Sequence, residues 1–149
     1  MSPNQPQQLT ASSVRRLYWT LVAGLVAIMA AFASLFWLGT APMLRGDPAG
    51  VAVIAPAMAI AAFASLAVGW FWARPNVPLR PASKASAAYW DDPNAGGRAV
   101  LLWVLWEGGS IIATVGSVLT GSFLPEAVAA TGLALLLTHG PSFLENRTG

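Results

Sequence analysis

The chain contains no cysteine, a single histidine and little charge. The absence of cysteine excludes a disulfide framework, a thiol nucleophile and a cysteine-ligated metal. One histidine without cysteine also leaves no donor set for a transition metal. The sequence carries no glycine-rich phosphate loop and no Ser/His/Asp set in a supporting context. We therefore predict a protein that is not an enzyme and needs no metal and no other cofactor.

Charge is too scarce for a water-soluble surface. Charged residues make up 9% of the 149 residues and hydrophobic residues make up 56%, whereas about 25% of the residues of a soluble domain are charged. The 14 glycines suit close packing of helices in lipid. The net charge of +2 comes from basic residues near the ends of apolar runs, a pattern that indicates membrane orientation and not nucleic-acid binding.

Four apolar runs predict an all-α integral membrane bundle of four transmembrane helices, at about 17–38, 51–72, 99–119 and 123–139. About 20 helical residues cross a hydrocarbon core of about 30 Å. A cleaved signal peptide or a twin-arginine export signal at Arg15-Arg16 is the alternative for the first run. We favour a membrane anchor, because the apolar run continues through Leu38.

Polar segments divide the chain into a flexible tail (1–14), a single transmembrane domain (15–141) with a loop at 73–98, and a second polar tail (142–149). Glu126 lies at the start of the fourth run, where the helix dipole favours an acidic residue. His139 precedes Gly140-Pro141 and is expected to lie at the end of that helix.

Basic residues predict the orientation of the bundle. In a four-helix topology Arg45 lies on one side, and the other seven basic residues lie on the opposite side: Arg15, Arg16, Arg74, Arg80, Lys84, Arg98 and Arg147. The positive-inside rule then places both termini and the loop 73–98 in the cytoplasm. We expect a multi-pass protein of a bacterial inner (plasma) membrane.

One carboxylate, Glu107, lies near the middle of the third run. On the insertion scale a central charge costs about 2.5–3.5 kcal/mol, and each Leu, Ile, Val or Phe contributes about 0.3–0.6 kcal/mol in favour. The aliphatic residues of 99–119 therefore offset the charge, and we expect this helix to insert. A carboxyl group at that depth should face the bundle or a partner subunit instead of lipid.

Helical spacing places two kinds of residue on neighbouring faces around Glu107. The candidate ion-binding residues form a polar stripe of Glu107, Ser110 and Thr114. The candidate helix-packing residues form a ridge of small side chains, Gly109, Ala113 and Gly116. Such a ridge lets another helix approach closely.

Two functions fit this pattern. In the first, which we favour, the chain is a non-enzymatic subunit or homo-oligomer packed through small residues, and Glu107 bonds a hydroxyl of a neighbouring helix and fixes its register. In the second, Glu107 binds a proton or cation for transport. The other three runs contain no mid-membrane acid, Lys, Arg or His, so a second copy or another subunit would complete a relay. The expected partners are the bilayer and membrane subunits.

Arg74-Pro75 opens the polar loop of the hairpin 51–119, and Glu107 is followed by Gly108-Gly109-Ser110 in the second helix of that hairpin. In these features the hairpin resembles the proteolipid c subunit of rotary ATPases. In that family a mid-membrane carboxylate takes up and releases the ion, which implies the same role for Glu107. The chain departs from the family in its alanine-rich first helix, its longer loop and the further helices on both sides.

Overall fold

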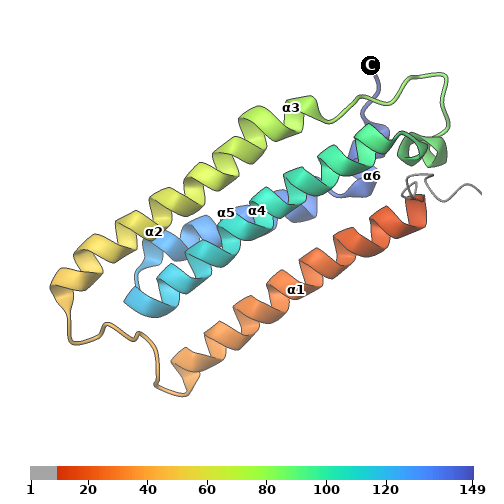
Figure 1. Cartoon of the computed structure of the whole chain (residues 1–149). Helices are drawn as coiled ribbons and strands as arrows, with labels where there is room; N and C mark the ends of the chain where they lie inside the picture. The colour runs from red at the N-terminus through yellow and green to blue at the C-terminus, as the bar shows by residue number, and fades with distance from the viewer. Residues whose placement is uncertain (1–9) are drawn as a thin grey trace, which may run out of the picture.

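The computed structural model describes residues 10–149 and is almost entirely helical in that range (Figure 1). The elements are α1 (Ala11–Trp37), α2 (Pro48–Val68), the π-helical η1 (Gly69–Ala73), α3 (Arg74–Asn76), the 3₁₀-helical η2 (Ser86–Asp91), α4 (Pro93–Thr120), α5 (Phe123–Thr138) and α6 (Pro141–Asn146). The predicted all-α class is confirmed. Of the predicted flexible tail at 1–14, residues 1–9 lie outside the described range, and 11–14 form the first turn of α1.

Three helices are long and apolar enough to cross a bilayer: Ala11–Trp37, the continuous helix Pro48–Asn76, and Asn94–Thr120. The fourth predicted span corresponds to α5, which is apolar but shorter. The three long helices begin earlier than the apolar runs indicated, at Ala11, Pro48 and Pro93 instead of 17, 51 and 99. Hydropathy marks only the apolar length of a helix, whereas polar residues can extend it beyond the hydrocarbon region.

Capping residues set these early starts. The Asp47 carboxylate accepts a hydrogen bond from Gly50 N (2.9 Å), and the Asp92 carboxylate accepts one from Asn94 N (2.9 Å). Each aspartate precedes a proline at the first helical position, where the missing N–H costs nothing. At its other end α4 stops at Gly121, whose φ of 66° is left-handed and suits glycine.

Helices α2, α4 and α5 pack closely on one another, and α1 packs chiefly against α4, on the other side of α4 from α2 (Figure 1). The segment 38–47 crosses from α1 to α2 beneath the end of α4. It is held there by backbone hydrogen bonds from Met43 N to Val118 O (3.2 Å) and from Leu44 N to Leu119 O (2.9 Å). Helix α4 is therefore the central element, and it carries Glu107.

Small residues allow the close approach of α2 and α5 to α4. A Cβ atom at Gly109 would lie 2.9 Å from the carbonyl oxygen of Ala62 on α2, and one at Gly116 would lie 2.7 Å from Cβ of Met58. Ala113 is fully buried against Ala62 and Ala129. The three residues of the predicted ridge thus lie against helices of the same chain.

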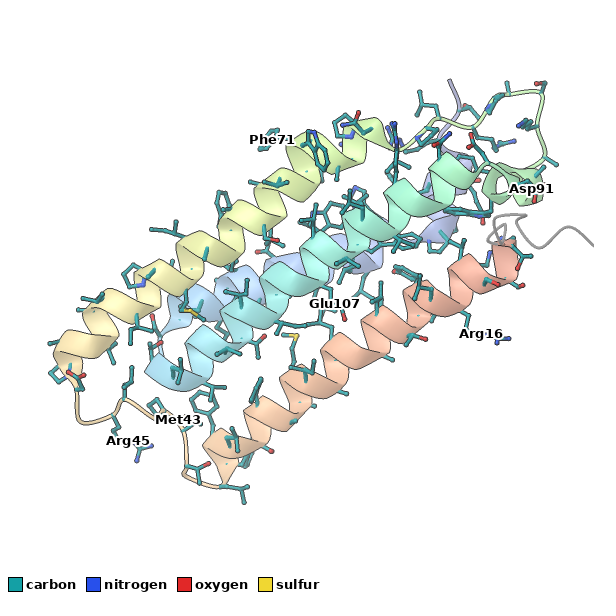
Figure 2. The ribbon with its side chains drawn as sticks, viewed as in Figure 1. Arg16, Met43, Arg45, Phe71, Asp91 and Glu107 are labelled. Carbon is teal, nitrogen blue, oxygen red and sulfur yellow. The ribbon has the colours of Figure 1, made fainter. Side chains whose placement is uncertain are left out.

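The two ends of the bundle differ in charge. The start of α1, α3, the segment 77–92, the start of α4 and α6 lie together at one end (Figure 1), which we call the basic end because it carries seven of the eight basic residues. Figure 2 shows Arg16 and Asp91 there, with Met43 and Arg45 at the opposite end. This arrangement agrees with the grouping of basic residues expected from the sequence.

Candidate functional site

Glu107 lies half-buried at the seam between α4 and α1. Figure 2 shows its side chain projecting from α4 toward α1, where a Cβ atom at Gly24 would lie 3.9 Å from Glu107 Oε1. Within residues 10–149 the carboxyl group takes part in no hydrogen bond and no ion pair, since the one ion pair of that range joins Arg15 and Glu145. The glycine on α1 leaves room for the carboxyl group but offers it no side-chain donor.

The other two candidate ion-binding residues, Ser110 and Thr114, form no hydrogen bond with the Glu107 carboxyl group. The buried hydroxyl of Ser110 donates to Trp106 O (2.8 Å) and faces Gly132 on α5, where a Cβ atom would collide with it. Thr114 donates to Ser110 O (2.8 Å). Both hydroxyl protons are used within α4, so the predicted stripe consists of one unpaired carboxyl group and two hydroxyls bonded to their own helix.

A cavity of about 300 Å³ continues the same seam toward the end opposite to the basic end. Its walls come from α1, α4 and α5 and combine apolar with polar side chains: Met29, Phe32, Phe36, Thr114, Ser117 and Glu126. Glu126 lies in the first turn of α5, as predicted, and is exposed. The cavity reaches neither Glu107 nor Gly24, because neither residue lines it.

Aromatic side chains fill the seam on the other side of Glu107. Trp103 is fully buried and donates from Nε1 to His139 O (2.9 Å). Tyr18 on α1 packs on the Trp103 ring with centroids 4.9 Å apart and donates to Leu136 O (2.8 Å). The indole and phenol hydrogens are thus bonded to backbone carbonyls, and none is directed to Glu107.

His139 follows the last residue of α5, as predicted for a helix end. Its ring is buried and stands edge-on to three aromatic rings, with centroid distances of 5.5 Å to Trp70, 5.2 Å to Trp106 and 4.5 Å to Phe143. Nδ1 lies 2.9 Å from Thr138 Oγ1. Within the described residues, no three His, Asp, Glu or Cys side chains gather as a metal site would require.

Sequence reasoning missed the buried carboxylate of the basic end. Glu145, in the predicted polar tail, lies on α6, and its side chain is only 7% exposed. It receives two hydrogen bonds from Arg15 Nη2 (2.9 Å each) and one from Trp90 Nε1 (2.6 Å). The sequence did contain a signal for this element. Pro141 can start a short helix, and Phe143 and Leu144 would give that helix an apolar face next to Glu145.

Trp90 belongs to the segment 73–98, which the sequence predicted as a polar loop. Trp90 and Tyr89 are both buried beneath the loop that follows α3. Burial raises the pKa of Tyr89 to about 12, so its hydroxyl stays protonated and donates to Pro78 O (2.7 Å). The proline-rich segment is therefore anchored by its aromatic residues to the interior of the bundle.

The chain matches no family model, no curated protein and no solved structure. The function must therefore be inferred from the geometry around Glu107.

Proposed function

We propose that this chain is a non-enzymatic, multispanning membrane protein that works as a subunit of a larger membrane assembly, either with further copies of itself or with other membrane proteins. Glu107 specifies that assembly. The observation that carries the proposal is the unpaired state of the Glu107 carboxyl group, which is half-buried between α4 and α1 and accepts or donates no hydrogen bond within residues 10–149.

The membrane placement is supported by the three long apolar helices and by the separation of charge between the two ends. Basic residues are enriched on the cytoplasmic side of membrane proteins, so the basic end belongs in the cytoplasm. A carboxyl group halfway along a spanning helix is costly in lipid unless a polar group pairs with it. The helices of residues 10–149 supply no such group, and a neighbouring subunit can.

An open face of α4 lies beside Glu107. Leu101 and Val104 are 41% and 46% exposed, and a Cβ atom at Gly108 would meet no atom within 4 Å. These residues lie on one stripe of the helix, with spacings of three and four residues. A glycine in such a stripe lets a second helix come close enough for a side chain to reach the adjacent carboxyl group. The ridge of Gly109, Ala113 and Gly116 is already occupied within the chain, so the open face carries the partner.

Three variants test the assembly. Glu107→Leu removes the polar group, Glu107→Gln keeps a hydrogen-bonding side chain, and Gly108→Leu covers the open face. We expect the wild type and Glu107→Gln to be oligomeric in lipid nanodiscs by native mass spectrometry, and the two leucine variants to be monomeric. Gly97→Leu is the control for distance from Glu107, because Gly97 is also open and lies on the same stripe, four residues before Leu101, but at the start of α4. A monomeric wild type, or normal assembly of Glu107→Leu, would contradict the proposal.

A second function, proton or cation handling as in the c subunit, is favoured by the cavity that continues the Glu107 seam with Thr114, Ser117 and Glu126. Such a carboxyl group must exchange protons with water. Labelling by a hydrophobic carbodiimide distinguishes the two functions. Selective modification of Glu107 that falls at high pH, together with normal assembly of Glu107→Gln, supports ion handling. Resistance of Glu107 to the reagent supports the structural role.

A further inference from the structure

A second cavity, of about 320 Å³, lies at the basic end between the helix Pro48–Asn76 and the start of α4. Its lining is amphipathic: Trp72, Ala73 and Leu101 are apolar, and Asn76 and Arg98 are polar. The cavity is separate from the Glu107 seam, and Leu101 is the one lining residue that it shares with the open face of α4 in the proposed assembly.

Arg98 is held in place on the wall of this cavity. Its Nη1 donates to the backbone oxygen of Asn76 (2.7 Å), which joins the start of α4 to α3. The other guanidinium hydrogens bond no acceptor among residues 10–149, and no carboxylate of that range pairs with Arg98. A guanidinium with one edge fixed and its remaining donors open is suited to a phosphate group.

The surrounding charge favours an anion. The basic end holds seven basic residues against three acidic ones, Asp91, Asp92 and Glu145. Glu145 is committed to Arg15 and Trp90, and Asp92 caps α4. The positive charge of this end is therefore only partly neutralised by the chain itself.

The apolar part of the lining identifies the kind of anion. Trp72 is 56% exposed, and Leu101 lies one helical turn beyond Arg98, away from the basic end. Tryptophan is enriched where headgroups meet hydrocarbon, and a basic pocket between helices on the cytoplasmic side suits a lipid headgroup. An anion with acyl chains fits this surface, because its chains can lie along Trp72 and Leu101.

We infer that this cavity binds the phosphate of an anionic phospholipid of the cytoplasmic leaflet, with Arg98 as the phosphate ligand and Trp72 and Leu101 along the acyl chains. The inference rests on the membrane placement given under the proposed function. It names a lipid of net negative charge, because a zwitterionic headgroup would bring its own cation to a site already rich in positive charge.

The test measures lipid retention by native mass spectrometry of the full chain released from nanodiscs of phosphatidylcholine with a minor share of phosphatidylglycerol. We expect the wild type to retain phosphatidylglycerol about tenfold over its share of the bilayer, and Arg98→Gln to lose that preference, because it removes a charge-assisted pair. Arg16→Gln is the matched control. It removes one positive charge from the same end, at an exposed residue outside the cavity, and should retain most of the preference.

Trp72→Ala provides an independent check, because it leaves the net charge unchanged and Trp72 is exposed, so folding should not depend on it. It should also lower the retention of phosphatidylglycerol. Equal losses in Arg98→Gln and Arg16→Gln would overturn the inference in favour of a diffuse charge effect. Displacement of the lipid by millimolar inorganic phosphate would overturn the lipid assignment. If the protein inserts into nanodiscs but retains phosphatidylglycerol no more than phosphatidylcholine, the lipid site alone is contradicted. If the protein does not insert into nanodiscs, the membrane placement is contradicted as well.

Discussion

Glu145 connects three elements at the basic end, because its carboxylate on α6 binds Arg15 of α1 and Trp90 of η2. The Arg15 side chain is 54% exposed, so solvent screens the ion pair and its contribution is at most about 1 kcal/mol. Trp90 is buried, and its N–H has no water to replace the carboxylate. The indole hydrogen bond is therefore the larger part of what Glu145 contributes to stability.

Glu145→Leu should lower the free energy of unfolding by about 1–3 kcal/mol, because it leaves the Trp90 N–H buried without an acceptor. Glu145→Gln should cost less, because the amide oxygen can still accept that hydrogen. Denaturant titration in mixed micelles, followed by tryptophan fluorescence, measures both. Glu126→Leu is the control at an exposed acidic residue and should change stability by less than about 0.5 kcal/mol. Equal losses of unfolding free energy in Glu145→Leu and Glu126→Leu would show that the Trp90–Glu145 hydrogen bond does not contribute to stability.

At the same scale, Glu107 could be recognised from the sequence because it is the one charge in the interior of an apolar run. Its neighbour on α1, Gly24, could not be recognised from the sequence. The helical repeat gives the face on which a residue lies, but which helix covers that face depends on the packing of the whole bundle. Likewise Ser110 and Thr114 share a stripe with Glu107 in sequence, yet their hydroxyls bond their own helix, an arrangement that competes with binding an ion.

At the scale of elements, apolar length predicted which segments are helical, and the caps explain where they begin. The starts at Pro48 and Pro93 follow Asp47 and Asp92, an Asp-Pro pattern that marks a helix start. Apolar length alone could not show this, nor could it show that 86–91 and 141–146 form short helices. These short elements are ordered by tertiary contacts of Trp90 and Glu145, which are not local in sequence.

The packing of α2 on α4 depends on Gly109. A Cβ atom there would lie 2.9 Å from the backbone oxygen of Ala62 and 3.0 Å from Leu66 Cδ2. Backbone cannot move aside as a flexible side chain does, so Gly109→Ala should separate the helices and cost about 1–3 kcal/mol. The readout is the free energy of unfolding in mixed micelles.

Gly97→Ala is the matched control on the same helix, because a Cβ atom at Gly97 would meet nothing within 4 Å. Alanine is favoured over glycine in a helix by about 1 kcal/mol, so this variant should be neutral or slightly more stable than the wild type. A loss at Gly97 as large as at Gly109 would mean that glycine is needed for a reason other than helix contact.

At the scale of the whole molecule, the seven basic residues gather at one end because four helices of alternating direction return the loop 77–92 and both described chain ends to the same side (Figure 1). The sequence predicted this grouping from an even number of spans. That prediction required the fourth apolar run to be a span, although this run is short. In the structure α5 packs along α4 and α2, so it is sheltered by longer helices and does not need the length of an isolated span.

The absence of cysteine makes the orientation directly measurable with single cysteines. Ser83→Cys and Ser142→Cys lie at the basic end and Met43→Cys at the opposite end, and all three positions are exposed. In right-side-out vesicles an impermeant maleimide should label Met43→Cys directly, and the other two only after permeabilisation. Labelling of all three from one side would contradict a bundle that crosses the membrane, and a reversed pattern would contradict the cytoplasmic placement of the basic end. The lipid site depends on that placement, since an anionic lipid reaches Arg98 only if the basic end faces the leaflet that carries it.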